Sequence, residues 1–285
     1  MSESGRGRPL TSIKGFIDRI DSLSVGTDEH LFFRGHSNRD EYYIEPSVFR
    51  KSKDGSLKGK EVEHVLFREL ITTNPSDFQS DTSTLERLAR MQHHSSPTRL
   101  LDITSNPLVA LYFTCKNHES NHGEVIVFRV KETEIKFFDS DTVSCIANLA
   151  RMTKEDKDKL NCDLSLDEFN SEDRDEVARL LHFIREEKPY FRNKIIPTDL
   201  KRVLVVRPKL NSKRILAQAG AFLLFGQVGR IDEEPVVGVS IERIIIDKAS
   251  KKVIKDKLDA LNINDGSLYL DIDSYAGYLK RKHKL

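Results

Sequence analysis

Cysteine is scarce in this sequence, and tryptophan is absent from it. Three cysteines occur in 285 residues, at positions 115, 145 and 162. Because their number is odd and their spacing is wide, we expect neither a disulfide framework nor a cysteine-type zinc site. Glycine and proline are also few, at 14 and 9 residues, which argues against fibrous and low-complexity classes.

The chain also lacks an excess of one charge and a long apolar run. Lysine and arginine number 46 against 45 acidic residues, and a net charge of +1 argues against a protein that coats DNA. No run of about 18 apolar residues occurs, so we expect no membrane partner. Residues 1–10 contain no apolar stretch of the signal-peptide kind. We therefore expect a soluble, cytoplasmic protein.

The apolar sequence that is present suffices for a core, since 38% of the residues are hydrophobic. The helical period of 3.6 residues, or a helix-opening proline, marks the segments 13–23, 61–71, 84–92, 107–117 and 251–261. Alternating or short apolar runs typical of strands occur at 31–35, 123–130, 135–138, 203–206, 221–225 and 236–246. This order predicts an α+β fold with N-terminal helices and a mixed or antiparallel β core.

We expect residues 1–285 to form one domain, because no linker or internal repeat interrupts them. Residues 1–10 are predicted to be a disordered arm. The strongly charged stretch 153–179 is predicted to be a helical insertion on the surface. Residues 230–285 are predicted to be the C-terminal strand and helix portion of the same domain.

The first polar motif is Phe33-Arg34-Gly35-His36, at the end of an apolar strand. An arginine there is costly unless it faces a cleft or forms an ion pair. The glycine after it lets a ligand or another segment approach the backbone closely. Arg34 is therefore either a clamp for an anion or amide of a nucleotide-like ligand, or one half of a structural salt bridge.

The second motif, residues 92–107, is dense in polar side chains between two predicted helices. Arg99 and Asp102 could pair with each other, or Asp102 could orient His93 or Arg34 through charge-assisted hydrogen bonds. Thr104 or Ser105 could cap the helix that follows, or could present a hydroxyl to a ligand.

A metal site built from His93, His94 and Asp102 is disfavoured. Adjacent histidines diverge in a strand or a helix, and no further ligand lies at a familiar spacing. The serines here also lack the glycine frame of a nucleophile elbow, which disfavours a serine hydrolase.

The third motif, residues 214–226, places Gln218 and Gly220 before an apolar strand. A glutamine amide both donates and accepts hydrogen bonds, so Gln218 suits a ribose hydroxyl or ties down a strand edge. No Walker loop and no GxGxxG motif after a strand occur in the sequence.

These motifs resemble those of the FRG domain, a family of bacteria and phages often found near defence genes. The resemblance rests on 33–35, 45–50, 92–113, the late motif with Arg214, Gln218, Gly220 and Phe222, and the ending 267–273. The chain departs from the usual pattern at His94, where an aromatic is usual, and at Ser95, where glycine is usual. These departures concern the shape of that loop.

The order of the motifs also resembles that of ADP-ribosyltransferases. Those enzymes carry an arginine or histidine on a first strand, a hydroxyl residue before a central helix, and a glutamate before a late strand. Arg34, Thr104 or Ser105, and Gln218 fall in that order here. Gln218 replaces the usual glutamate, and a neutral amide can hold a ribose hydroxyl but cannot act as a base.

The resemblance implies an NAD-dependent ADP-ribosyltransferase or NAD glycohydrolase, acting as a toxin or in phage defence, with a protein or nucleic acid as acceptor. The catalytic residues that it implies are Arg34, Thr104, Ser105 and Gln218. The residues expected at the cofactor are Arg34, Gly35, His36, His93, Arg99, Asp102 and Arg214. Two alternatives stay open: a non-catalytic sensor that binds a ligand or partner in the same cleft, and a metal-dependent nuclease.

Overall fold

The structure is a computed structural model that describes residues 8–51, 55–56, 58–231, 236 and 238–283. The first seven residues of the predicted arm lie outside this part of the chain. Within the arm, Leu10 forms a bridge to Ile246, with its N–H 2.8 Å from the carbonyl of Ile245. The arm is therefore anchored to the sheet at its end.

The helices lie mostly where the apolar period predicts them. Short stretches are held by side-chain caps, such as Ser12 at α1 and the reciprocal Ser83–Glu86 capping box at α4. The helices are α1 Ile13–Asp21, α2 Lys58–Thr73, α3 Pro75–Phe78, α4 Thr84–His93, α5 Pro107–Lys116, α6 Asp141–Asn148, α7 Lys154–Lys159, α8 Leu166–Phe169, α9 Asp175–Glu187, α10 Lys213–Ala217, α11 Lys251–Ala260, α12 Asp265–Tyr269 and α13 Ile272–His283.

The described strands form one sheet in the order β4-β5-β6-β2-β1-β3-β7. Strands β4 and β5 run parallel, and the other neighbours pair antiparallel, which confirms the predicted α+β class with a mixed core. The strands are β1 Glu29–His36, β2 Leu100–Thr104, β3 Gly123–Lys131, β4 Ile135–Phe137, β5 Val203–Arg207, β6 Gly220–Phe225 and β7 Val239–Ile246.

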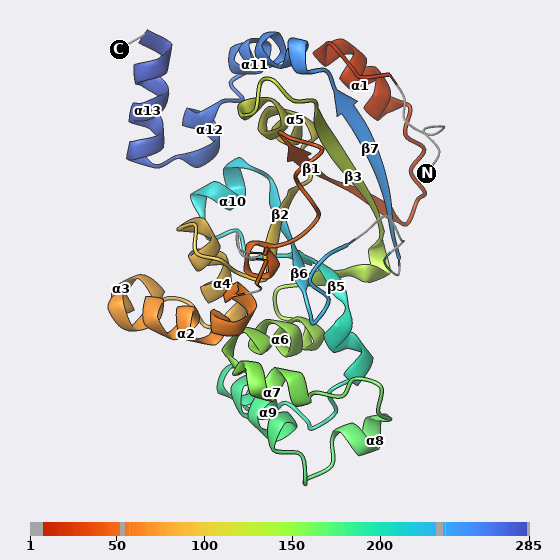
Figure 1. Cartoon of the computed structure of the whole chain (residues 1–285), viewed down its shortest axis with the longest axis vertical. Coiled ribbons are helices and arrows are strands. Elements are labelled where there is room, and N and C mark those ends of the chain that lie inside the picture. The colour runs from red at the N-terminus through yellow and green to blue at the C-terminus, as the bar shows by residue number, and fades with distance from the viewer. Residues whose placement is uncertain (1–7, 52–54, 57, 232–235, 237, 284–285) are drawn as a thin grey trace.

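The sheet curls around a core of its own side chains and is covered outside by two groups of helices (Figure 1). Alternation along each strand sends residues such as Phe32, Ile126 and Leu223 into the inner cluster, to which all seven strands contribute. Helices α1, α5 and α11 pack outside β1, β3 and β7, whereas α4, α6 and α9 pack outside β2, β5 and β6. The boundary between the two groups falls between β1 and β2.

Strands β1 and β2 hardly pair at this boundary. They share a single register pair, Phe33 with Thr104, whereas β1 and β3 pair along eight residues. The sheet is thus split at its centre, between the strand that carries Arg34 and the strand that carries Asp102. Polar side chains from both strands can therefore face a common cleft.

The charged stretch 153–179 is more deeply built into the fold than its composition predicts. Leu160, Cys162, Phe169 and Val177 are buried in the same cluster as strand residues of β5 and β6. Charges cover one side of these short helices, and the widely spaced apolar residues between them supply the core. No helix in the described part of the chain is long and apolar enough to cross a membrane.

Candidate functional site

A cleft of about 810 Å³ opens where β1 and β2 separate. It brings together Arg34, Gly35 and His36 of β1 with residues of the two later motifs. Those residues are Asp102, Thr104, Arg214 and Gln218, which are separated from Arg34 by up to 184 positions in the chain. Its volume falls within the range of about 300–1,000 Å³ that is usual for small-molecule sites.

Arg34 is half-buried at the cleft and has no acidic partner. Its Nη1 donates to the backbone carbonyl of Asp102 at 2.5 Å, and its Nε donates to Nε2 of His36 at 3.2 Å. No described carboxylate lies within ion-pair distance of it, so a structural salt bridge does not explain its presence. Burial lowers the pKa of Arg34 to about 10, which leaves it cationic at neutral pH.

His36 fixes the guanidinium of Arg34 as a neutral imidazole. Its Nδ1 lies 3.2 Å from Oε1 of Glu124, a carboxylate that also pairs with Arg243. Because Nε2 accepts from Arg34, the proton of the neutral ring belongs on Nδ1, where it is donated to Glu124. Burial is the main reason that the pKa of His36 falls to about 4.

Gly35 is required by packing as well as by any ligand. A Cβ at this position would lie 2.0 Å from the carbonyl oxygen of Ala110 and 2.7 Å from the backbone nitrogen of Thr114, both in α5. The glycine thus lets helix α5 lie directly against β1. This close approach places the first turns of α5, with Val109 and Phe113, at the wall of the cleft.

Asp102 contacts one of its predicted partners, Arg34, in a different way from the one expected. Its backbone carbonyl, and not its carboxylate, holds Arg34. The carboxylate accepts from Nε2 of Gln92 at 3.2 Å and lies 3.8 Å from Nη2 of Arg214. This carboxylate is partly exposed, and Asp102 lines both the cleft and a neighbouring pocket.

The two hydroxyl candidates behave differently from each other, and neither caps α5. The helix is capped by Asn106, whose side chain accepts from the N–H of Leu108. Thr104 is buried; its Oγ1 donates to the carbonyl of Gln218 at 2.6 Å and accepts from the N–H of Asn106. Ser105 is exposed, with its hydroxyl 3.3 Å from the carbonyl of Ala219. Thr104 therefore connects the second motif to the third.

Gln218 is 7% exposed and sits at the end of α10, just before β6. Its Nε2 donates to the carbonyl of Leu268, so it ties the C-terminal segment to the site. Its Oε1 has no hydrogen-bond partner among the described residues and can accept from a ligand hydroxyl. The next residue, Ala219, has a left-handed φ of 45°, which turns the chain sharply into the strand.

His93 lies beside the cleft and not in it. Together with Gln92 and Arg214 it lines the neighbouring pocket, and its buried Nδ1 has no hydrogen-bond partner among the residues that the structure describes. Burial and the nearby Arg214 lower the pKa of His93. In the described residues no group of three or more His, Cys, Asp or Glu side chains is placed to hold a metal ion.

Just after the end of α4, Ser95 takes up a φ of 62°, the conformation that glycine adopts freely.

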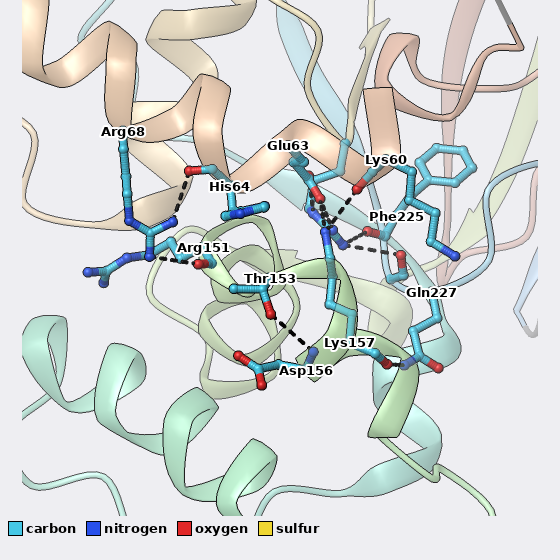
Figure 2. A network of polar contacts seen from close by, with 12 residues as sticks. Lys60, Glu63, His64, Arg68, Arg151, Thr153, Asp156, Lys157, Phe225 and Gln227 are labelled. Atoms are coloured by element: carbon cyan, nitrogen blue, oxygen red, sulfur yellow. Dashed lines mark hydrogen bonds and ion pairs between the residues drawn. The ribbon is translucent and has the colours of Figure 1, made fainter. Parts of the chain in front are cut away.

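Arg99, expected at the cofactor, lies elsewhere. It is 1% exposed and forms a bidentate ion pair with Glu63 of α2. Its Nη1 also donates to the carbonyls of Phe225 and Gly226 (Figure 2). Arg99 does not pair with Asp102, because its guanidinium is bound by Glu63, which is remote in sequence.

Several residues that line the cleft were not predicted from the sequence. Arg50, Lys116 and Arg230 add positive charge to it, and Tyr43 and Tyr269 add aromatic rings. The guanidinium of Arg230 lies 3.5 Å from the ring centroid of Tyr43, and the ammonium of Lys116 lies 4.3 Å from that of Tyr269. Arg50 and Tyr269 fall inside segments that carry the family resemblance, which was the available signal. Arg230 had none.

The cleft is basic although the chain as a whole is nearly neutral. Six basic side chains line it against three acidic ones: Arg34, Arg50, Lys51, Lys116, Arg214 and Arg230, against Glu41, Glu45 and Asp102. Aromatic side chains are interspersed among them: Phe33, Tyr42, Tyr43, Phe113 and Tyr269. Cations together with exposed rings suit a ligand that carries both phosphate groups and aromatic bases.

Comparison with known proteins gives one family. The family model described as FRG domain matches residues 29–123, the segment that contains β1, β2, α5 and the cleft residues Arg34 to Asn117. No curated protein and no solved structure matches the chain.

Proposed function

We propose, for a chain that carries an FRG domain, that the split between β1 and β2 binds NAD and that the protein cleaves its bond to nicotinamide. One observation carries the proposal. Arg34, Thr104 and Gln218 come from three separate motifs, and all line one cleft: Arg34 lies on β1, Thr104 on the neighbouring strand β2, and Gln218 at the end of α10, just before β6. This is the order and local context in which ADP-ribosyltransferases carry their site residues.

The cleft offers side chains that could bind the diphosphate, a base and a ribose of a dinucleotide. Arg34 and Arg50 would hold the diphosphate, because no carboxylate of the described residues pairs with Arg34 and the charge of Arg50 acts on it electrostatically. The ring of Tyr43 or Tyr269 would stack on a base. Oε1 of Gln218 would accept a hydrogen bond from a ribose hydroxyl.

The reaction breaks the bond between C1′ of the ribose and the nicotinamide nitrogen, and nicotinamide leaves as a neutral base. A new bond forms between C1′ and an oxygen or nitrogen of water or of a protein or nucleic-acid acceptor. Gln218 cannot take the proton that this nucleophile loses, so we assign the proton to the carboxylate of Asp102, which lines the same cleft. Thr104 is a positioning residue, because its hydroxyl holds the backbone of Gln218.

The test is incubation of the protein with NAD, with free nicotinamide and mass shifts on protein and nucleic acid as readouts. We expect nicotinamide release by the wild type and a loss of about 10²-fold or more in Arg34→Ala, because the diphosphate loses its anchor. Arg19→Ala, on α1 with a surface ion pair, should match the wild type. The proposal fails if the wild type neither turns over NAD nor is stabilised by it.

A second function is favoured by the amide of Gln218. Because this residue is neutral and its Nε2 is already used by Leu268, the cleft suits a sensor that binds a nucleotide without turnover. Stabilisation by NAD without nicotinamide release would identify that function. A toxin or phage-defence role in the cytoplasm is proposed from the transferase chemistry alone, and growth arrest on expression, relieved by Arg34→Ala, would support it.

A further inference from the structure

A second cavity, of about 280 Å³, lies away from the proposed NAD cleft, where α2 and α7 meet the start of β2. It is lined by the basic side chains Lys60, Arg99 and Lys157 and by the amide residue Gln227. None of these lines the NAD cleft. The cavity is too small for a dinucleotide but has room for a phosphate group.

The buried ionised groups around this cavity carry more positive than negative charge. Arg99 and Lys157 are 1% and 5% exposed, and the single buried carboxylate beside them is that of Glu63. Both oxygens of Glu63 are already engaged: Oε1 with Nε of Arg99, and Oε2 with Nη2 of Arg99 and with Nζ of Lys157 at 2.9 Å (Figure 2). Two cations therefore share one carboxylate.

The other buried acidic side chains of the described residues, Asp81, Glu86 and Glu124, pair with other cations. Asp158 also lines the cavity, but its carboxylate is partly exposed and pairs with Lys154. The ammonium of Lys60 at the rim adds a third cation, and no described carboxylate lies within ion-pair distance of it. An uncompensated buried charge costs several kcal/mol, so an anion in this cavity would stabilise the fold.

The donors that remain suit an oxyanion. The Nζ of Lys157 uses two of its three hydrogens, on Glu63 and on the carbonyl of Lys60 at 3.3 Å. Burial is the main cause that lowers the pKa of Lys157, and the charges of Arg99 and Lys60 lower it further. A bound anion would reverse that effect.

We propose that this cavity binds a phosphate group, either as the free anion or as the end of a small phosphomonoester. The site lies at the opposite end of the β2–β6 pair from Thr104 and Gln218. Arg99 immediately precedes β2 and holds the carbonyls of Phe225 and Gly226 at the end of β6. Phosphate would thus bind a group that already joins the two strands.

The test is thermal unfolding of the full chain at constant ionic strength, with chloride replaced by orthophosphate. We expect a saturable rise in Tm of about 3 °C for the wild type. Lys157→Met leaves Arg99 and Glu63 balanced and should abolish the rise. Lys159→Met, on the same helix but exposed, should respond as the wild type does. A general salt effect would raise all three alike and would overturn the proposal.

Two further variants test the phosphate site even if Lys157→Met does not fold, and they separate it from the proposed NAD cleft. Lys60→Met at the rim should weaken the response several-fold even if Lys157→Met fails to fold. Arg34→Ala should keep the full response, which distinguishes this cavity from the NAD cleft. If the response is lost in Arg34→Ala and kept in Lys60→Met, phosphate binds in the cleft and the proposal is wrong.

Glycerol phosphate serves as the second arm of the titration. An equal rise shows that the cavity admits a phosphomonoester, and a rise with orthophosphate alone shows a site for the free anion. No rise with either probe in the wild type would contradict the proposal, whatever NAD does.

Discussion

The protonation state of His36 determines whether its ring can accept the hydrogen bond from Arg34. Its neutral ring accepts from Arg34 and donates to Glu124, and its folded pKa of about 4 lies below its ordinary value of 6.5. Protonation of Nε2 would remove the acceptor for Arg34 and place two cations side by side. The hydrogen bond between Arg34 and His36 therefore depends on the neutral form of this histidine.

This pKa predicts a pH dependence of stability. On acidification the unfolded chain takes up the proton near pH 6.5, whereas the folded chain resists it until about pH 4. Stability is therefore lost as the pH falls from about 6.5 to about 4, by on the order of 3 kcal/mol from this group. Urea unfolding of His36→Gln against wild type at several pH values measures the slope that His36 contributes.

The control for this measurement is His182→Gln on α9, because that side chain is exposed. Its slope should match that of the wild type. An unchanged slope in His36→Gln would show that His36 does not titrate in this range.

Among the elements, the contact between β1 and α5 determines the shape of the cleft. The sequence showed glycine after Arg34 and predicted a close approach of ligand or chain, and the structure places α5 there. An added Cβ at Gly35 would meet the Ala110 carbonyl at 2.0 Å, a clash that backbone atoms cannot avoid by a rotamer change.

Gly35→Ala should therefore destabilise the protein by about 1–3 kcal/mol or more through overpacking. Gly277→Ala is the matched control, since the nearest atom to its added Cβ is 3.6 Å away at the end of a flexible arginine. Urea denaturation of the two variants compares them. Equal stability of Gly35→Ala and wild type would mean that α5 does not lie against β1 as described.

Sequence patterns predicted most elements because periodicity needs only local information. They missed α6, which is buried and apolar on most sides, and α10, which is five residues long. Neither offers enough positions for an amphipathic period to show. The sequence also offers Thr104 or Ser105 as a candidate N-cap of α5, whereas Asn106 is the residue whose side chain accepts from the N–H of Leu108.

Across the whole molecule, the three motifs were predicted to meet, and their candidate site residues other than Arg99 and Ser105 do line one cleft or its neighbour. The exceptions depend on distant partners. Arg99 is removed from the cleft by Glu63, 36 residues away, and Arg230 enters it from a segment without a motif. Such long-range contacts are set by packing and leave no local pattern.

Long-range packing also determines the position of the stretch 153–179. Its buried residues make it part of the main core. Phe169→Ala should cost about 3–5 kcal/mol, because its side chain is fully buried, and unfolding should remain a single transition. Leu166→Ala on the same helix should change stability far less, since Leu166 is 42% exposed. A small effect of Phe169→Ala would indicate a separate surface insertion.

If the split between β1 and β2 binds NAD with Arg34 as its anchor, loss of the Arg34 side chain must weaken the binding of NAD. Calorimetric titration of the full chain with NAD, in wild type, Arg34→Ala and Arg19→Ala, tests it most directly. We expect saturable binding at one site for the wild type and Arg19→Ala, and affinity at least about 10-fold weaker for Arg34→Ala, since charge-assisted bonds to phosphate are lost. No binding by the wild type, or equal binding by Arg34→Ala, would contradict the account.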